Sequence, residues 1–156
     1  MTQIKSIMSK NLKTISAGSN LGEAYRVMEE FRIRHLPVLN DLGDVTGILS
    51  YKNLLTNTSV LAMPVEYFMS FPIVEIPENT SLKKAVLTLL EQKISSLLVT
   101  NAQYEVVGIV TTDDLLWHLA SQLKTDADED ENTPFIVSKN AQTIGEIARL
   151  LSQVGI

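Results

Sequence analysis

An internal repeat organises most of the chain. A shift of 61 residues aligns residues 4–55 with residues 65–116 without a gap. Most of the matching positions are apolar or glycine, which is what two copies of one packing scheme preserve. One copy is too small to bury a sheet face by itself, so we expect the two copies to pack against each other.

Each copy predicts the order strand, helix, strand, strand, helix. Asn20 and Glu23 have the spacing of a capping box before apolar residues at helical intervals, and Ser81 precedes the equivalent helix. The β-type segments span residues 36–39 and 45–50 in the first copy and 97–100 and 106–111 in the second. A second helix is expected near Tyr51 and near Thr112. The pattern favours an α+β fold of two β-α-β-β-α repeats.

The rest of the chain differs in composition from the repeats. We expect repeat one over residues 4–60, repeat two over 64–122, an acidic linker over 123–134 and a strand and helix extension over 135–156. Apolar residues recur at helical spacing near the C-terminus, which predicts an amphipathic helix there. Its apolar face requires cover from this chain or from another.

Composition excludes several classes of function. The 156 residues include 13 Lys+Arg and 18 Asp+Glu, a net charge of −5 that disfavours a nucleic-acid partner. No apolar run approaches the roughly 20 residues of a spanning helix, so we expect no membrane insertion. The N-terminus lacks a signal pattern, which predicts a cytoplasmic protein. The absence of cysteine excludes a disulfide framework, a thiolate metal site and a cysteine nucleophile.

Catalytic motifs are also missing from the sequence. There is no nucleophile and base pair at a recognisable spacing, no HExxH and no phosphate-binding Walker motif. The two histidines lie in different halves of the chain and lack further ligands for a metal. We therefore expect no enzyme, no metal site and no required cofactor.

Several motifs resemble a tandem cystathionine-β-synthase-type (CBS) domain pair. They are Gly108-Ile109-Val110-Thr111-Thr112-Asp113-Asp114-Leu115, His35-Leu36-Pro37-Val38, and the openings Ile7-Met8-Ser9 and Phe68-Met69-Ser70. The resemblance covers residues from about 4 to 120. It implies a stand-alone Bateman module with pseudo-twofold symmetry and two clefts between the copies. Each cleft of such a module can hold AMP, ADP, ATP or a related adenosyl ligand such as S-adenosylmethionine.

The resemblance implies that the first cleft joins the end of the second copy to the opening of the first. Its candidate residues are Ser9, Thr14, Ile33, Arg34, His35, Pro37, Ile109, Thr111 and Asp114. Thr111 lies where a strand gives way to a helix, so unpaired N–H groups there can meet a phosphate. Asp114 would accept from ribose hydroxyls, and Arg34 would pair with phosphate. The alternatives are that Thr111 and Asp114 only cap the helix, that Arg34 is solvated and that His35 is a packing residue.

The second cleft is expected to bind more weakly. Its candidate residues are Ser50, Asn53, Ser70, Ile94, Ser95 and Ser96. Asn53 stands where the family usually has Asp, and no arginine stands at the position equivalent to Arg34. Lys52 offers a cation, whereas Glu75 would repel a phosphate.

Two functions remain open from the sequence. The first is a regulatory module that binds an adenosyl ligand and signals through its conformation or its affinity for an unidentified regulated protein. The alternative is a dimerisation or scaffold module with vestigial clefts. The family commonly forms homodimers through its helices, and the apolar residues Leu115, Leu116, Trp117 and Leu119 suit such an interface.

Overall fold

The computed structural model describes residues 2–54 and 60–123. Both repeats lie within one unit that ends at Gln122. The expected extension over 135–156, and the expected acidic linker beyond Leu123, lie outside the described residues.

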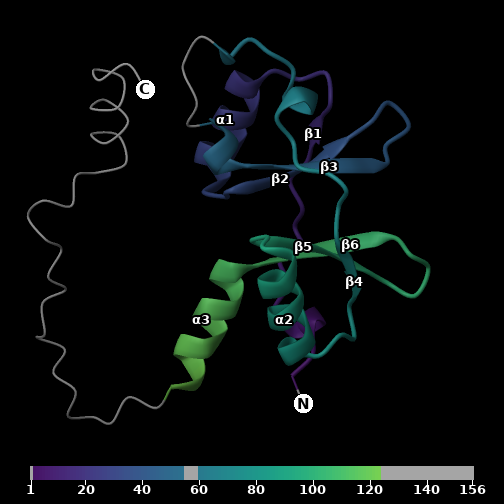
Figure 1. The fold of residues 1–156 in the computed structure, drawn as a ribbon, viewed down its shortest axis with the longest axis vertical. Helices are drawn as coiled ribbons and strands as arrows, with labels where there is room; N and C mark the ends of the chain where they lie inside the picture. The colour runs from purple at the N-terminus through teal and green to yellow at the C-terminus, as the bar shows by residue number, and fades with distance from the viewer. Residues whose placement is uncertain (1, 55–59, 124–156) are drawn as a thin grey trace, which may run out of the picture. The chain divides into compact units, whose positions relative to one another are not determined.

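The two repeats have the predicted order of elements (Figure 1). The first contains β1 (Ile15–Ser16), α1 (Leu21–Phe31), β2 (His35–Leu39), β3 (Val45–Ser50) and the 3-10 helix η2 (Tyr51–Leu54). The second contains β4 (Glu75–Pro77), α2 (Leu82–Gln92), β5 (Ser96–Thr100), β6 (Val106–Thr111) and α3 (Thr112–Gln122). Short 3-10 helices precede each repeat, η1 (Ile4–Ser6) and η4 (Val65–Tyr67). The α+β class is confirmed, and the helix expected near Tyr51 is a 3-10 helix as far as it is described.

Each repeat builds a three-stranded mixed sheet with the same register. The first strand runs parallel to the second, and the second is antiparallel to the third. Ile15 pairs with Val38 in the first sheet, and Ile76 pairs with Val99 in the second. Both pairs differ by the 61-residue shift of the sequence repeat. The duplicated pattern of side chains therefore produces a duplicated backbone.

Capping groups define where α1 and α2 begin. The Asn20 Oδ1 accepts from the Glu23 N–H at 2.9 Å, and the Glu23 Oε2 accepts from the Asn20 N–H at 3.1 Å. This reciprocal pair satisfies two donors that the first helical turn leaves unpaired. The Ser81 Oγ accepts from the Lys84 N–H at 3.3 Å in the same position of the second repeat. The capping predicted from the spacing is confirmed at both helices.

The opening segment of each repeat packs into the core of the other. Ile4, which is fully buried, and Met8 lie in the apolar core of the second repeat. Val65 and Met69, at the opening of the second copy, pack in the core of the first. Each apolar core therefore contains residues from both sequence copies, so the boundaries of the cores differ from those of the sequence repeats.

Backbone pairing fixes this exchange of segments. Ser9 and Ile109 exchange two hydrogen bonds of 2.9 and 3.0 Å, and Ser70 and Ile48 exchange two of 2.8 and 3.1 Å. Ile48 and Ile109 also pack with Leu98 in a third buried apolar cluster that contains residues of both repeats. Backbone hydrogen bonds thus tie the opening segment of each copy to the other copy, and apolar burial joins the two sheets.

Candidate functional site

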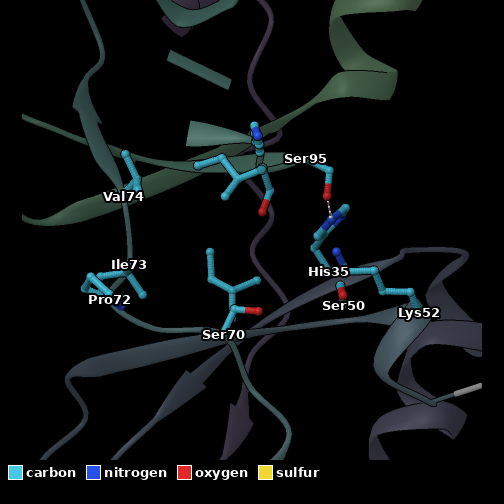
Figure 2. A pocket seen from close by; sticks show the side chains of 12 residues that line it. His35, Ser50, Lys52, Ser70, Pro72, Ile73, Val74 and Ser95 are labelled. Atoms are coloured by element: carbon cyan, nitrogen blue, oxygen red, sulfur yellow. Dashed lines mark hydrogen bonds between the residues drawn. The ribbon is translucent and has the colours of Figure 1, made fainter. Parts of the chain in front are cut away.

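A cavity of about 160 Å³ lies between the repeats, at the second of the two predicted clefts. Its lining residues are His35, Ile48, Ser50, Lys52, Ser70, Pro72, Ile73, Val74, Lys93, Ile94, Ser95 and Ser96. Figure 2 shows His35, Ser50 and Lys52 of the first repeat across from Ser70 and residues 72–74 of the second. Five of the six residues predicted for this cleft line the cavity.

Asn53, the sixth, holds the edge of the cavity in place. Its Oδ1 accepts from the Ser50 N–H at 2.9 Å and from the Ser50 Oγ at 2.6 Å. These bonds fix the Ser50 hydroxyl at the end of β3, where η2 begins. Asn53 therefore positions a lining residue from outside the lining itself.

The cavity wall combines apolar side chains, serine hydroxyls and two lysines. The isoleucine, valine and proline side chains offer a surface for a flat apolar group, and the hydroxyls offer hydrogen bonds. Lys52 and Lys93 supply positive charge, and none of the described lining residues is Asp or Glu. Glu75, which was expected to repel a phosphate here, is an exposed residue of β4 and is not among them.

Sequence reasoning missed Lys93 and residues 72–74. Lys93 ends α2 in a left-handed conformation with φ 54° and ψ 40°, and the chain turns there into β5. Its equivalent, Arg32, ends α1 with φ 52° and ψ 42°. Lys93 could have been predicted from the repeat, because Arg32 and Lys93 are equivalent cations that directly precede the predicted site residues Ile33 and Ile94.

At the first predicted cleft, Thr111 and Asp114 bond to each other. The Thr111 N–H and Oγ donate to the Asp114 Oδ2 at 2.7 and 2.8 Å, and the Asp114 N–H donates to the Thr111 Oγ at 3.3 Å. This is the geometry of a helix cap at the start of α3, as the alternative interpretation of these residues expects. Ser50 and Asn53 form the equivalents of the first two of these bonds in the first repeat.

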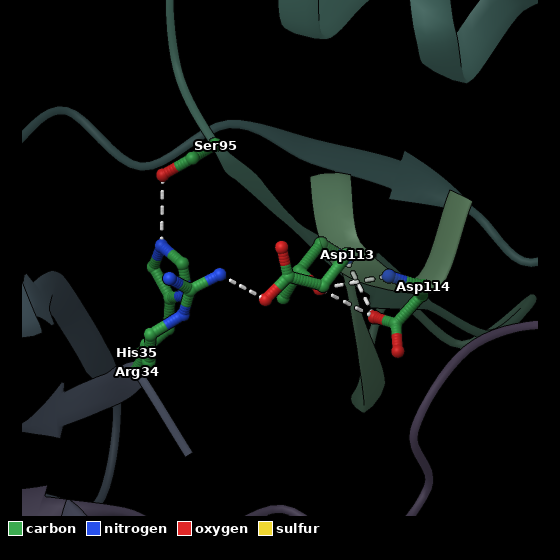
Figure 3. A network of polar contacts seen from close by, with 6 residues as sticks. Arg34, His35, Ser95, Asp113 and Asp114 are labelled. Carbon is green, nitrogen blue, oxygen red and sulfur yellow. Dashed lines mark hydrogen bonds and ion pairs between the residues drawn. The ribbon is translucent and has the colours of Figure 1, made fainter. Parts of the chain in front are cut away.

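An ion pair crosses between the repeats beside this cap. Arg34, just before β2, pairs with Asp113 in the first turn of α3 (Figure 3). The two side chains are 60% and 47% exposed, so the pair contributes only about 0–1 kcal/mol to stability. The ion pair matters for binding more than for stability, because it engages Arg34, the cation that was expected to meet a phosphate in this cleft.

His35 makes a further side-chain contact between the repeats. Its Nε2 lies 2.8 Å from the Ser95 Oγ, and Figures 2 and 3 both show the two side chains pointing at each other. Burial lowers the pKa of His35 from its ordinary value, and the positive charge of Arg34 lowers it further. The imidazole is therefore neutral at pH 7 and lines the cavity as a hydrogen-bonding group.

The other residues predicted for the first cleft lie in different surroundings. Ser9 is paired with Ile109 through the backbone, which brings the opening of one copy to the sheet of the other. Ile33 packs against the core of the first repeat, and Pro37 is buried in β2. Thr14 is exposed just before β1. The structure thus brings Ser9 to Ile109, and Arg34 to the turn that holds Thr111 and Asp114.

The described residues contain no group of three or more His, Asp or Glu side chains that could hold a metal ion. Among the same residues, no helix is both long and apolar enough to cross a membrane.

Comparison with known families identifies the fold. The model of the CBS domain matches residues 4–59 and 65–121. The chain therefore belongs to the CBS domain family and carries two of its domains in tandem.

The relatives of this chain include enzymes and a separately solved CBS domain pair. A homoserine O-acetyltransferase from Methanohalobium evestigatum is 27% identical over 114 residues, which cover 73% of this chain and 23% of that enzyme. The CBS domain pair of protein MJ0100, solved with 5′-methylthioadenosine and S-adenosylmethionine, has a TM-score of 0.72 and 23% identity, covering 79% of this chain and 99% of the other. A conserved protein from Pyrococcus horikoshii has a TM-score of 0.70 and 30% identity, covering 80% and 96%.

Proposed function

We propose that the chain is a regulatory module that binds an adenosyl ligand between its two repeats. The ligand class is AMP, ADP, ATP or a related compound such as S-adenosylmethionine. The observation that carries the proposal is the cavity whose walls come from both repeats and from five residues that the family resemblance implies. The adenosyl ligands of the MJ0100 domain pair support the same ligand class for this fold.

Ligand binding would signal by changing how the repeats are spaced. Small-molecule sites usually have volumes of about 300 Å³ or more, so the cavity of about 160 Å³ must widen around a whole nucleotide. Because its walls belong to different repeats, widening moves one repeat against the other. The His35–Ser95 hydrogen bond and the Arg34–Asp113 ion pair span the same boundary and would respond to that movement. The ligand shifts this equilibrium by its different affinities for the two arrangements.

Thermal unfolding with a panel of ligands tests the proposal. AMP, ADP, ATP, S-adenosylmethionine and 5′-methylthioadenosine are each added at millimolar concentration, with CMP as the control. A ligand at 100 times its dissociation constant stabilises the fold by about 2.7 kcal/mol, which raises the melting temperature by roughly 5–11 °C. Unchanged melting temperatures with every adenosyl compound would contradict the proposal.

The setting and partners of the module are part of the same proposal. The regulatory role needs no catalysis, and the acetyltransferase activity of the relative belongs to a protein of which this chain spans 23%. We place the module in the cytoplasm, where adenine nucleotides are available. Its further partner would be a protein whose affinity for the module changes when the ligand binds.

The exposed faces of α2 and α3 favour a homodimer. No residue of α3 is buried, Trp117 is 78% exposed and Leu116 is 63% exposed. Leu90 of the neighbouring α2 is 67% exposed. Apolar side chains gathered in this way usually mark an interaction surface. The same observation supports the second candidate function, a dimerisation scaffold, which would assemble equally well with and without an adenosyl ligand.

A further inference from the structure

The two clefts differ in charge at one pair of equivalent positions. In the first cleft these positions hold Arg34 and Asp113, which form an ion pair. The 61-residue shift places Ser95 and Lys52 at the same two positions of the second cleft. The arginine of the first cleft is therefore neutralised, whereas the equivalent positions of the second cleft hold a cation, Lys52, and a neutral serine.

Lys52 is available to a ligand in the second cleft. It makes no ion pair with any described residue. Figure 2 shows its side chain extending from η2 towards His35, and it lines the cavity. Its positive charge is also one of the causes that lower the pKa of His35, which agrees with a position close to the imidazole.

Lys93 adds a second positive charge from the other repeat. The backbone of Lys93 is held in a left-handed conformation at the end of α2, where its N–H donates to the carbonyls of Leu89 and Leu90. Lys93 also makes no ion pair with a described residue. The cavity thus has one lysine from each repeat and no described carboxylate in its lining.

We propose that Lys52 and Lys93 make the second cleft selective for adenosyl ligands that carry phosphate. This inference rests on the proposed function and narrows its ligand class. A phosphate group carries negative charge and accepts hydrogen bonds from ammonium groups, which bind it as compact point charges. 5′-Methylthioadenosine offers no such charge, and the sulfonium of S-adenosylmethionine is repelled. The ion pair at Arg34 makes the first cleft the poorer phosphate site, so one nucleotide binds per chain, in the cleft that the sequence ranked second.

Calorimetric titration of the full chain tests this selectivity. The probes are AMP, ATP, adenosine, 5′-methylthioadenosine and S-adenosylmethionine, each in 50 mM and 300 mM salt. We expect AMP and ATP to bind at least about tenfold more tightly than the uncharged and cationic compounds at low salt, with one site per chain. Added salt should reduce this preference, because both lysines are exposed to solvent and screened.

Variants separate the two clefts. Lys52→Met and Lys93→Met keep an apolar stem and remove the charge, and each should weaken AMP binding about 3–10-fold while leaving 5′-methylthioadenosine unchanged. Lys83→Met is the matched control, since Lys83 is an exposed lysine of α2 outside the cavity lining and its loss should leave AMP binding unchanged. Arg34→Met removes the cation of the first cleft. Circular dichroism melts confirm that each variant is folded, as expected for exposed positions.

The outcomes distinguish this inference from the proposed function. Equal binding of AMP and 5′-methylthioadenosine, or loss of AMP binding in Arg34→Met alone, would overturn the inference and leave an adenosyl-binding module. Two equivalent sites per chain would overturn it as well. If no adenosyl compound binds, including adenosine, the proposed function fails and the inference fails with it.

Discussion

Gly108 lies where the opening segment of the first repeat crosses the sheet of the second. A Cβ atom built on Gly108 would lie 2.7 Å from the Met8 Sδ and 3.0 Å from the Ser9 carbonyl oxygen. The methionine side chain can adjust, but the carbonyl belongs to the Ser9–Ile109 backbone pair. Gly47 faces Met69 in the equivalent way. Glycine at these two positions therefore permits the close crossing that joins the repeats.

Replacing this glycine should destabilise the whole fold. We expect Gly108→Ala to lower the free energy of unfolding by about 1–3 kcal/mol, because the added methyl overpacks a closed crossing. Gly18→Ala is the control, since nothing lies within 4 Å of a Cβ at that exposed turn. Urea denaturation of both variants measures the difference. Equal midpoints for Gly108→Ala and Gly18→Ala would argue against a tight crossing.

The neutral state of His35 makes stability depend on pH. Burial and the Arg34 charge hold its pKa below the value of about 6.5 that it has in the unfolded chain. Lys52 lowers it further, and Asp113 and Asp114 oppose the shift. The unfolded chain therefore binds the proton more readily, so this contribution to stability is complete above pH 6.5 and is lost as the pH falls towards the folded pKa.

A substitution isolates this effect. His35→Gln keeps a hydrogen-bonding side chain opposite Ser95 and cannot titrate. Between pH 7.5 and pH 5.5 we expect the natural chain to lose more stability than this variant, measured as the free energy of unfolding in urea at each pH. Parallel pH profiles for the two proteins would show that His35 does not titrate on unfolding.

At the scale of elements, Asp114 acts as the cap of α3. Asn53 accepts from the Ser50 N–H and hydroxyl as Asp114 accepts from the Thr111 N–H and hydroxyl, so an amide oxygen can take the place of a carboxylate in these two bonds. The difference between Asp114 and Asn53, which the sequence suggested as a sign of unequal binding, leaves these two hydrogen bonds in place. The role in capping and a role in binding can therefore be separated by experiment.

We expect Asp114→Ala to lower the free energy of unfolding by about 0.5–2 kcal/mol, because the Thr111 N–H and hydroxyl lose their acceptor. Asp114→Asn should retain most of that stability, as Asn53 indicates. Urea denaturation measures the stability of both variants. A larger loss for Asp114→Asn than for Asp114→Ala would contradict the capping role.

At the scale of the whole molecule, α3 presents exposed apolar side chains, among them Leu116 and Trp117. If two copies meet through these side chains, Trp117→Lys should convert a dimer into a monomer, because a charge would be buried without a partner. Tyr104→Lys is the control, since Tyr104 is 89% exposed on the β5–β6 turn. Light scattering after size-exclusion chromatography measures the mass. An unchanged dimer in Trp117→Lys would place the interface elsewhere.

The effect of AMP on the dimer distinguishes the two candidate functions. Under the regulatory proposal, AMP changes the dimer mass, the dimer dissociation constant or the binding of a partner. Under the scaffold alternative, the dimer dissociation constant stays the same at saturating AMP. Sedimentation equilibrium with and without AMP distinguishes the two.

Residue spacing along the chain was enough to predict the duplication, the element order and the helix starts at Asn20 and Ser81. These features depend on the spacing of residues near each other in the chain, and local backbone geometry sets that spacing. Five of the six residues expected around the second cleft line the cavity, because the family resemblance implied which segments of the two copies meet there. Lys93 was missed because its contribution depends on the backbone turn at the end of α2.

The contacts between side chains of different repeats were visible only in the folded chain. Arg34 and Asp113 are 79 residues apart, and His35 and Ser95 are 60 apart, so no local pattern pairs them. The exchange of opening segments likewise depends on which apolar surface each segment covers best. Packing of the complete chain chooses among such distant partners, and that choice leaves a neutralised arginine at one cleft and two lysines at the other.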